Sequence, residues 1–220
     1  MGAHHTVEGL IEVNLSSRKV RISQTEQGRA VLRKIGSQIE LQATRTALLE
    51  QHKEAVQINP LPRSMQPGKD ERRQTARAKA VARQLEENPA VLYANASIKK
   101  HDDQATSLAT SIDKLMVNAS LGMTDTAVAE EVAVALALVR LSINTVVADS
   151  KSAYGSFCRG VISSLACAII SKHKPPRHSI DVVWVPAHSM VEGNAYAEHH
   201  TRELFIRADD EPSYAVTSFK

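Results

Sequence analysis

The order of strand-like and helix-like segments after residue 90 restricts the fold of this 220-residue chain more than any other feature. Residues 91–98 alternate in polarity as a β-strand does, and residues 105–112 and 115–121 predict two more strands. Asp113-Lys114, between the last two segments, predicts a tight turn. Because short turns join antiparallel strands, we expect these three strands to run antiparallel to one another.

Helices and strands alternate in the following hundred residues. Thr124 or Asp125 is a candidate N-cap for an apolar helix. The expected elements are a helix at 129–141, a strand at 144–148, two helices within 151–172 that are interrupted at Gly160, a strand at 179–185 and a helix at 194–205. The two later strands need helical crossovers, which predicts that they run parallel to the first strand. The predicted fold is therefore a mixed α/β domain whose five-stranded mixed sheet has helices on both faces.

The first 90 residues have a different character. Residues 25–36 and 43–56 predict helices, prolines at 60, 62 and 67 predict a break, and residues 70–85 predict a charged helix. This pattern predicts a helical N-terminal extension on the α/β domain. The expected division is 1–57 for the extension, 58–90 for a basic linker and helix, 91–207 for the α/β domain and 208–220 for a C-terminal tail.

The formal net charge of +3 hides an uneven distribution. Residues 1–90 contain 15 Lys and Arg against 10 Asp and Glu, a balance of +5, whereas residues 91–220 contain 12 against 14, a balance of −2. A basic arm beside an acidic module suits a nucleic-acid partner, and a merely solvated basic helix is an equally good explanation of the charge alone. The candidate nucleic-acid-binding residues are Arg72, Arg73, Arg77, Lys79, Arg83, Ser150 and Lys151.

Neither a membrane span nor a signal peptide is evident. No apolar run reaches the roughly 18 residues that a spanning helix needs, and the N-terminus lacks a basic start followed by an apolar core. We therefore expect a monomeric intracellular protein, cytoplasmic or nuclear. The two cysteines, Cys158 and Cys167, fall in one helical region and are expected to be buried reduced thiols, with a disulfide as the alternative.

Candidate catalytic residues stand at the ends of the predicted elements. Asp149 follows the fourth strand, and Glu130 lies near the start of the apolar helix. The apolar run Val182 to Val185 leads through Pro186 into a loop with His188, and a Gly-Asn pair then opens the helix that carries Glu198. Ligands bind beyond the carboxyl ends of parallel strands, so these groups are expected to converge. Each also has a structural explanation: Asp149 as an N-cap and Glu130 as a first-turn acid favoured by the helix dipole.

Three motifs occur in the order of one known family. Ala129-Glu130-x-x-Ala133-Val134 resembles Ala-Glu-x-x-Ala-Ile, and Ala148-Asp149-Ser150 resembles the Thr-Asp-Ser strand end of the type 1 ribonuclease H domain. Residues 182–198 resemble its last strand, its Pro-Gly-His-Ser loop and its Gly-Asn-x-x-Ala-Asp helix. Residues 60–77, with Pro-Leu-Pro and Arg-Arg, resemble the connector in polyproteins of arthropod non-LTR retrotransposons, such as those of ticks. Residues 1–57 would then be a remnant of the region after the reverse transcriptase.

The resemblance implies hydrolysis of the RNA strand of RNA–DNA hybrids. The family uses two divalent cations, Mg²⁺ or Mn²⁺, roughly 3.5–4 Å apart, held by four acids and assisted by a mobile histidine. The four metal positions fall on Asn95, Glu130, Asp149 and Glu198, and the histidine falls on His188.

This chain departs from the family at four of its positions. Asn95 and Glu198 stand where the family has aspartate, and Ala187 and Met190 replace glycines. A neutral amide bridges two cations poorly, and the longer Glu198 moves its oxygens by about 1 Å, a displacement that can cost a hundredfold in rate. Asp102 or Asp103 is an alternative for the first acid, whose position falls on Asn95. The expected function is an impaired ribonuclease H. The alternatives are a catalytically inactive nucleic-acid-binding relic and an unrelated interaction domain.

Overall fold

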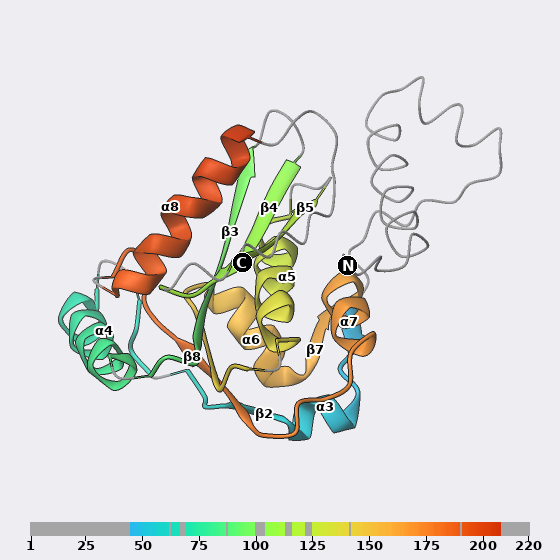
Figure 1. The fold of residues 1–220 in the computed structure, drawn as a ribbon. Coiled ribbons are helices and arrows are strands. Elements are labelled where there is room, and N and C mark those ends of the chain that lie inside the picture. Colours follow the sequence, from blue (N-terminus) through green and yellow to red (C-terminus); the bar gives the residue numbers. More distant parts are fainter. Residues whose placement is uncertain are drawn as a thin grey trace.

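The central feature of the computed structural model is a six-stranded mixed sheet (Figure 1). The structure describes residues 45–61, 63–66, 69–86, 88–99, 104–112, 116–121, 125–140, 142–189 and 191–207. The predictions for a helix at 25–36, for the Asp113-Lys114 turn, for Asp102, Asp103 and Met190, and for the tail at 208–220 lie outside these residues.

The strands are ordered β2-β8-β6-β3-β4-β5. Their bounds are β2 Val56–Ile58, β3 Val91–Lys99, β4 Gln104–Thr110, β5 Met116–Leu121, β6 Thr145–Ala148 and β8 Ile180–Trp184. β3, β4 and β5 are antiparallel, and β6 and β8 run parallel to β3, as predicted. The predicted number of five strands is wrong, because β2 adds a sixth strand parallel to β8.

Helices cover both faces of the sheet, which confirms that prediction. One face packs against α5 (Thr126–Leu138), α6 (Lys151–Arg159) and α7 (Ser164–Ser171). The other face packs against α4 (Glu71–Leu85) and α8 (Glu192–Arg207). The alternation of strand side chains accounts for the two layers, because successive residues of a strand point to opposite faces. Leu92 and Ala94 of β3 belong to the first core, whereas Val91 and Tyr93 belong to the second.

The helix α5 lies at the centre of the larger core. Every residue from Val128 to Leu138 is buried, including the two glutamates, which explains why the segment is apolar on nearly all sides. Its N-cap is Asp125, whose carboxylate accepts the backbone N–H groups of Ala127 and Val128. The helix therefore begins three residues before the expected start, with its polar end held by the predicted cap.

Residues 45–58 form strands and a short helix instead of the long helix predicted at 43–56. β1 (Arg45–Ala47) pairs antiparallel with β7 (Val161–Ser163), α3 (Glu50–Glu54) follows, and β2 then joins the edge of the sheet. Helix-forming composition is a weak preference, and here the unpaired edges of β7 and β8 outweigh it. The boundary expected between residues 57 and 58 runs through β2, so residues 45–57 are not a separate or loosely docked extension.

Two further expectations concern the state of the two cysteines and the presence of a membrane-spanning helix. Both thiols are free, Cys167 is buried as predicted, and Cys158 is exposed, contrary to the prediction. Cys158 lies one residue before the end of α6, on the side turned away from the sheet core. Among the described helices, none has the length and apolar character needed to cross a membrane.

Candidate active site

The pairing of the neighbouring strands β3 and β6 brings the first two candidate positions together, because Asn95 lies midway along β3 and Asp149 directly follows the end of β6. Ala94 pairs with Ala148 in the parallel register, so the next residues along the two strands are Asn95 and Asp149. Asn95 is buried, with 6% of its surface exposed. The sheet thus sets the backbones of these two residues side by side at the edge where parallel strands bind ligands.

Glu130 approaches this edge from α5. Its side chain is buried, one oxygen accepts the backbone N–H of Ala96 in β3, and Oε2 has no hydrogen-bond partner among the described residues. Burial raises the pKa of Glu130 well above its ordinary value, and the negative charge of Asp149 raises it further. A buried carboxylate oxygen without a partner is costly, so Glu130 is not explained by the stability of the fold.

Asp149 is held in place by two donors. The Nδ2 of Asn194 donates to Oδ2 at 3.1 Å, and the indole Nε1 of Trp184 donates to the backbone carbonyl at 2.9 Å. Burial raises the pKa of the Asp149 carboxyl; the bond from Asn194 opposes the shift, and the charge of Glu198 adds to it. Asn194 is itself 1% exposed, and its Oδ1 has no hydrogen-bond partner in the described part of the chain.

The Gly-Asn pair at the start of α8 has a separate explanation for each residue. A Cβ on Gly193 would lie 2.1 Å from the ring of Tyr93, so only glycine allows α8 to approach β3 this closely. That approach brings Asn194 within reach of Asp149. Asn194 is a site residue that motif matching did not assign, although its position directly after the glycine was a usable signal.

His188 and Glu198 lie at the outer side of the site. His188 is exposed and adopts a left-handed backbone conformation with φ of 53°. Its Nδ1 lies 3.2 Å from Oε1 of Glu198, which also accepts a bond from Arg202 one turn further along α8. The charges of both His188 and Glu198 act on the pKa of Asp149, so the predicted residues from β6, the loop and α8 share one electrostatic environment.

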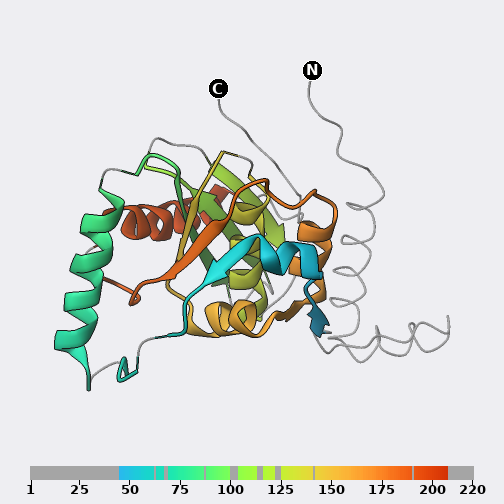
Figure 2. The ribbon, with the colours of Figure 1, turned by 90° about the horizontal axis from the view of Figure 1, so that it is seen from below.

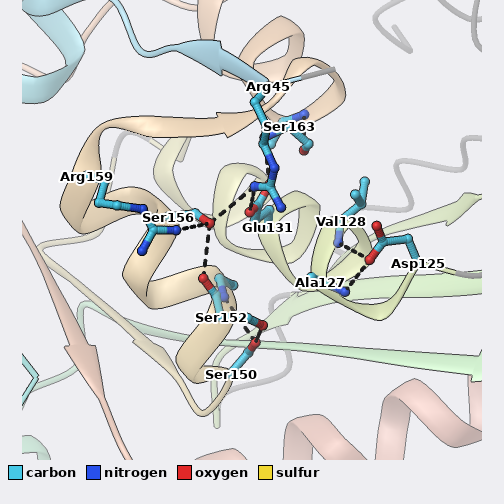
Figure 3. A network of polar contacts seen from close by, with 12 residues as sticks. Arg45, Asp125, Ala127, Val128, Glu131, Ser150, Ser152, Ser156, Arg159 and Ser163 are labelled. Atoms are coloured by element: carbon cyan, nitrogen blue, oxygen red, sulfur yellow. Dashed lines mark hydrogen bonds and ion pairs between the residues drawn. The ribbon is translucent and has the colours of Figure 1, made fainter. Parts of the chain in front are cut away.

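The neighbouring glutamate, Glu131, has a structural role (Figure 3). It is fully buried, forms an ion pair with Arg45 of β1, and accepts the backbone N–H of Ser163 at 2.6 Å. Arg45 also donates to Ser156 of α6 at 3.2 Å. The two adjacent glutamates therefore differ: Glu131 joins β1 and β7 to α5, whereas the pKa of Glu130 responds to the charge of Asp149 and one of its oxygens has no partner among the described residues.

The residues that could hold a cation are few. Among the described residues, no group of three or more His, Cys, Asp or Glu side chains is arranged to hold a metal ion. Mg²⁺ is often bound through only one or two carboxylates together with water and substrate phosphate. The partnerless Oε2 of Glu130 beside Asp149 fits such a partly formed site, and these are hard oxygen donors. Glu198 fits less well, because Arg202 and His188 already occupy it.

The predicted nucleic-acid contacts divide into two groups. Four of them point outward from α4 and are exposed: Arg72, Arg73, Lys79 and Arg83. The other three make contacts within the protein. Arg77 donates to the carbonyl of Trp184 at 3.1 Å, Lys151 donates to the carbonyl of Met65 and lies over the Trp184 ring, and Ser150 caps α6.

Comparisons with known proteins add no identification. The sequence matches none of the family models with which it was compared, and no curated protein resembles it significantly in sequence.

Proposed function

We propose that this chain is a divalent-cation-dependent nuclease of the ribonuclease H type, which hydrolyses the RNA strand of RNA–DNA hybrids at a rate reduced by Asn95 and Glu198. One observation carries the proposal. Glu130 of α5 and Asp149 after β6 are both buried acids, the charge of Asp149 raises the pKa of Glu130, and one buried oxygen of Glu130 has no partner among the described residues. The mixed sheet with three antiparallel strands followed by two parallel ones is consistent with that fold.

The chemistry assigns a distinct role to each residue. Glu130 and Asp149 would hold the cation, which lowers the pKa of a bound water and neutralises the charge that develops on the leaving oxygen. Asn194 keeps Asp149 oriented through its 3.1 Å hydrogen bond. His188 is exposed and lies 3.2 Å from Glu198, and we propose that it moves a proton to or from a departing group.

A second candidate function is nucleic-acid binding without catalysis. The specific observation in its favour is that two of the four expected acids are altered or occupied. Asn95 is neutral, and Glu198 is held by Arg202 and His188. On this alternative the chain still binds nucleic acid, but too little negative charge remains at the site to hold the cations that hydrolysis requires.

Reversion of the altered acids separates the two candidates. We expect the unmodified chain to cleave a fluorescent RNA–DNA hybrid slowly in Mg²⁺ or Mn²⁺. Asn95→Asp should increase the rate roughly tenfold or more, since each ~1.4 kcal/mol of transition-state stabilisation is worth a factor of ten. Adding Glu198→Asp should increase it again, because ligands of one metal site couple. Gel analysis of the labelled RNA strand gives the rates.

Two variants provide the controls. Asp149→Asn on the reverted background should abolish the gain, whereas Asp181→Asn, an exposed acid near the opposite end of β8, should leave it unchanged. Cleavage in the reverted chain that survives Asp149→Asn would contradict the assignment of the site. No cleavage by any variant, with hybrid binding retained, would favour the binding protein over the nuclease.

A further inference from the structure

The outward face of α4 carries a row of cations that do not belong to the candidate active site. Arg72, Lys79 and Arg83 are all exposed. At 3.6 residues per turn they lie within about 40° of one another around the helix, and at 1.5 Å per residue they span ~16 Å along it. Arg73 flanks the row at its N-terminal end. We call these four residues the basic stripe.

The basic stripe does not contribute to the packing of α4. The helix packs on the second core through Ala78, Val81 and Leu85 on its opposite side. No hydrogen bond or ion pair joins a stripe side chain to any other described residue. The stripe is therefore a solvent-facing set of positive charges that the described fold leaves unneutralised.

Two of these charges oppose the helix on which they stand. Arg72 and Arg73 lie in the first turn of α4, where Glu71 is the acid in that turn. Cations near a helix N-terminus are unfavourable by about 0.3–1 kcal/mol each, because the macrodipole is positive there. Arginines that destabilise their own helix and lack partners in the described structure are expected where an anionic partner compensates them.

The position of α4 connects the stripe with the candidate active site. Arg77, on the inner side of α4, donates to Trp184, and Trp184 donates in turn to the backbone of Asp149. Val191 and Ala197 of the α8 region share the core that α4 packs on. Figures 1 and 2 both show α4 alongside the first turns of α8. The stripe thus stands on a helix whose inner side contacts the end of β8, next to the backbone of Asp149.

We infer that the basic stripe binds the sugar-phosphate backbone of a nucleic acid and anchors it outside the candidate active site. Arginine matches phosphate geometry through paired N–H groups, and a nucleic-acid backbone supplies closely spaced charges along the length of the stripe. The other exposed residues from position 74 to position 84 of the helix are small or polar: Thr75, Ala76, Ala80 and Gln84. They offer no aromatic or large apolar anchor of the kind that protein partners use.

This inference deepens the proposed function and rests on it in one respect, because the proposed function is the reason to expect an RNA–DNA hybrid as the bound nucleic acid. Arg77 of α4 bonds Trp184, and Trp184 bonds the backbone of Asp149, so the stripe and the candidate active site are held on one connected part of the structure. A nucleic acid that contacts both must be long enough to extend from Asp149 to the outer side of α4. Hybrids shorter than this should bind less tightly than longer ones, and their affinity should change little when the stripe is removed.

Salt-dependent binding tests the inference without cleavage. The ligand is a fluorescently labelled 20-base-pair RNA–DNA hybrid, measured by anisotropy between 50 and 200 mM KCl in buffer with EDTA. We compare the full chain with the triple variant Arg72→Ala, Lys79→Ala, Arg83→Ala. The slope of log Kobs against log salt should become shallower by about 3, since each lost phosphate contact contributes ~0.9. Circular dichroism should be unchanged, because the three side chains are exposed.

The matched control removes three exposed cations elsewhere: Lys172→Ala, Lys174→Ala and Arg177→Ala. These residues lie at and beyond the end of α7, on the opposite side of the molecule from α4 (Figure 2). The slope of log Kobs against log salt for this control variant should stay close to that of the unmodified chain.

Two results would overturn the inference. One is a folded stripe variant with an unchanged salt slope. The other is equal competition by an acidic polypeptide such as polyglutamate, which would make the stripe a general or protein-binding surface. Failure of the proposed function can be told apart from failure of this inference. If the chain does not cleave the hybrid but its salt slope still depends on the stripe, the nuclease proposal is contradicted and the inference about the stripe stands.

Discussion

At the scale of single residues, the adjacent acids Glu130 and Glu131 show how little the residue type says about a role. Both are buried in α5, but Glu131 forms an ion pair with Arg45 and accepts the backbone N–H of Ser163, whereas Glu130 experiences the charge of Asp149 and has one oxygen without a partner among the described residues. A side chain that lowers stability and sits beside another acid is expected at a functional site. The functional assignment of Glu130 therefore depends on its surroundings.

Removing the charge of Glu130 should stabilise the protein at neutral pH. The pKa of Glu130 is raised in the folded state, which means that folding favours the protonated side chain. The stability that the protonated side chain allows is fully present below the pKa of the unfolded state and is lost as pH rises through the pKa of the folded state. Glu130→Gln removes that loss and should raise stability by on the order of 1 kcal/mol or more, since one pKa unit is worth ~1.4 kcal/mol. The gain should shrink as pH falls toward 4.5, measured by urea unfolding in metal-free buffer.

Glu131→Gln is the matched comparison, one residue further along the same helix. Its carboxylate accepts bonds from Arg45 and the backbone of Ser163, so loss of charge should destabilise the protein by about 1–3 kcal/mol. Opposite signs for the two variants are expected. Destabilisation of similar size by both would show that Glu130 is also a structural acid, and the site assignment would lose its main support.

At the scale of secondary-structure elements, β1 is attached to the domain through a buried charge. The Glu131 side chain is 0% exposed, and that of Arg45 is 40% exposed. Arg45→Ala leaves the carboxylate without its cation, which in buried pairs costs about 3–5 kcal/mol. Replacing both residues by methionine should recover most of the loss, because apolar substitutes of similar volume often replace a buried pair without cost.

Chemical unfolding of the single and double variants measures this effect. The control is Lys53→Ala, which breaks the exposed pair with Glu50 at 3.1 Å and should change stability by less than about 1 kcal/mol. If the double methionine variant is no more stable than Arg45→Ala, the pair contributes through specific geometry that apolar packing does not replace.

The elements differ in how well the sequence could predict them. β3, β5 and α5 have strong local patterns and were predicted to within a few residues. β1, α3 and β2 contain three to five residues each and depend on the edges of β7 and β8, which no local pattern reveals.

The same limit applies to side chains at the candidate site. Motif order predicted the positions of Glu130, Asp149, His188 and Glu198, and the structure sets their charges in one environment. The inward turn of Arg77 and Lys151 depends on Trp184 and Met65, distant in sequence, and so could not be predicted.

At the scale of the whole molecule, residues 45–86 wrap around the β8 edge of the sheet (Figure 2). β1 and α3 lie beside α7, β2 extends the sheet, and α4 covers the opposite face. Along the way, Asn59 accepts the hydroxyl of Tyr154 and Met65 accepts Lys151, both from α6. One continuous segment therefore contacts both layers of helices and the strand between them, so the sequence-based boundary at residue 58 divides a single packed unit.

Truncation at that boundary should therefore destabilise the domain. A chain of residues 59–220 loses Leu48 from the main core, the β2 ladder on β8, and the partner of the buried Glu131. Burying one large aliphatic side chain contributes ~1.5–3 kcal/mol, and unpairing a buried carboxylate costs about 3–5 kcal/mol. Together these losses approach the whole stability of an ordinary domain, about 5–15 kcal/mol.

A chain of residues 45–220 keeps all three contacts and is the control. We expect 45–220 to unfold cooperatively in urea, and 59–220 to unfold at much lower urea or to bind a hydrophobic dye without denaturant. Equal midpoints and slopes for the two chains would mean that residues 45–58 do not stabilise the domain, contrary to their position in its core.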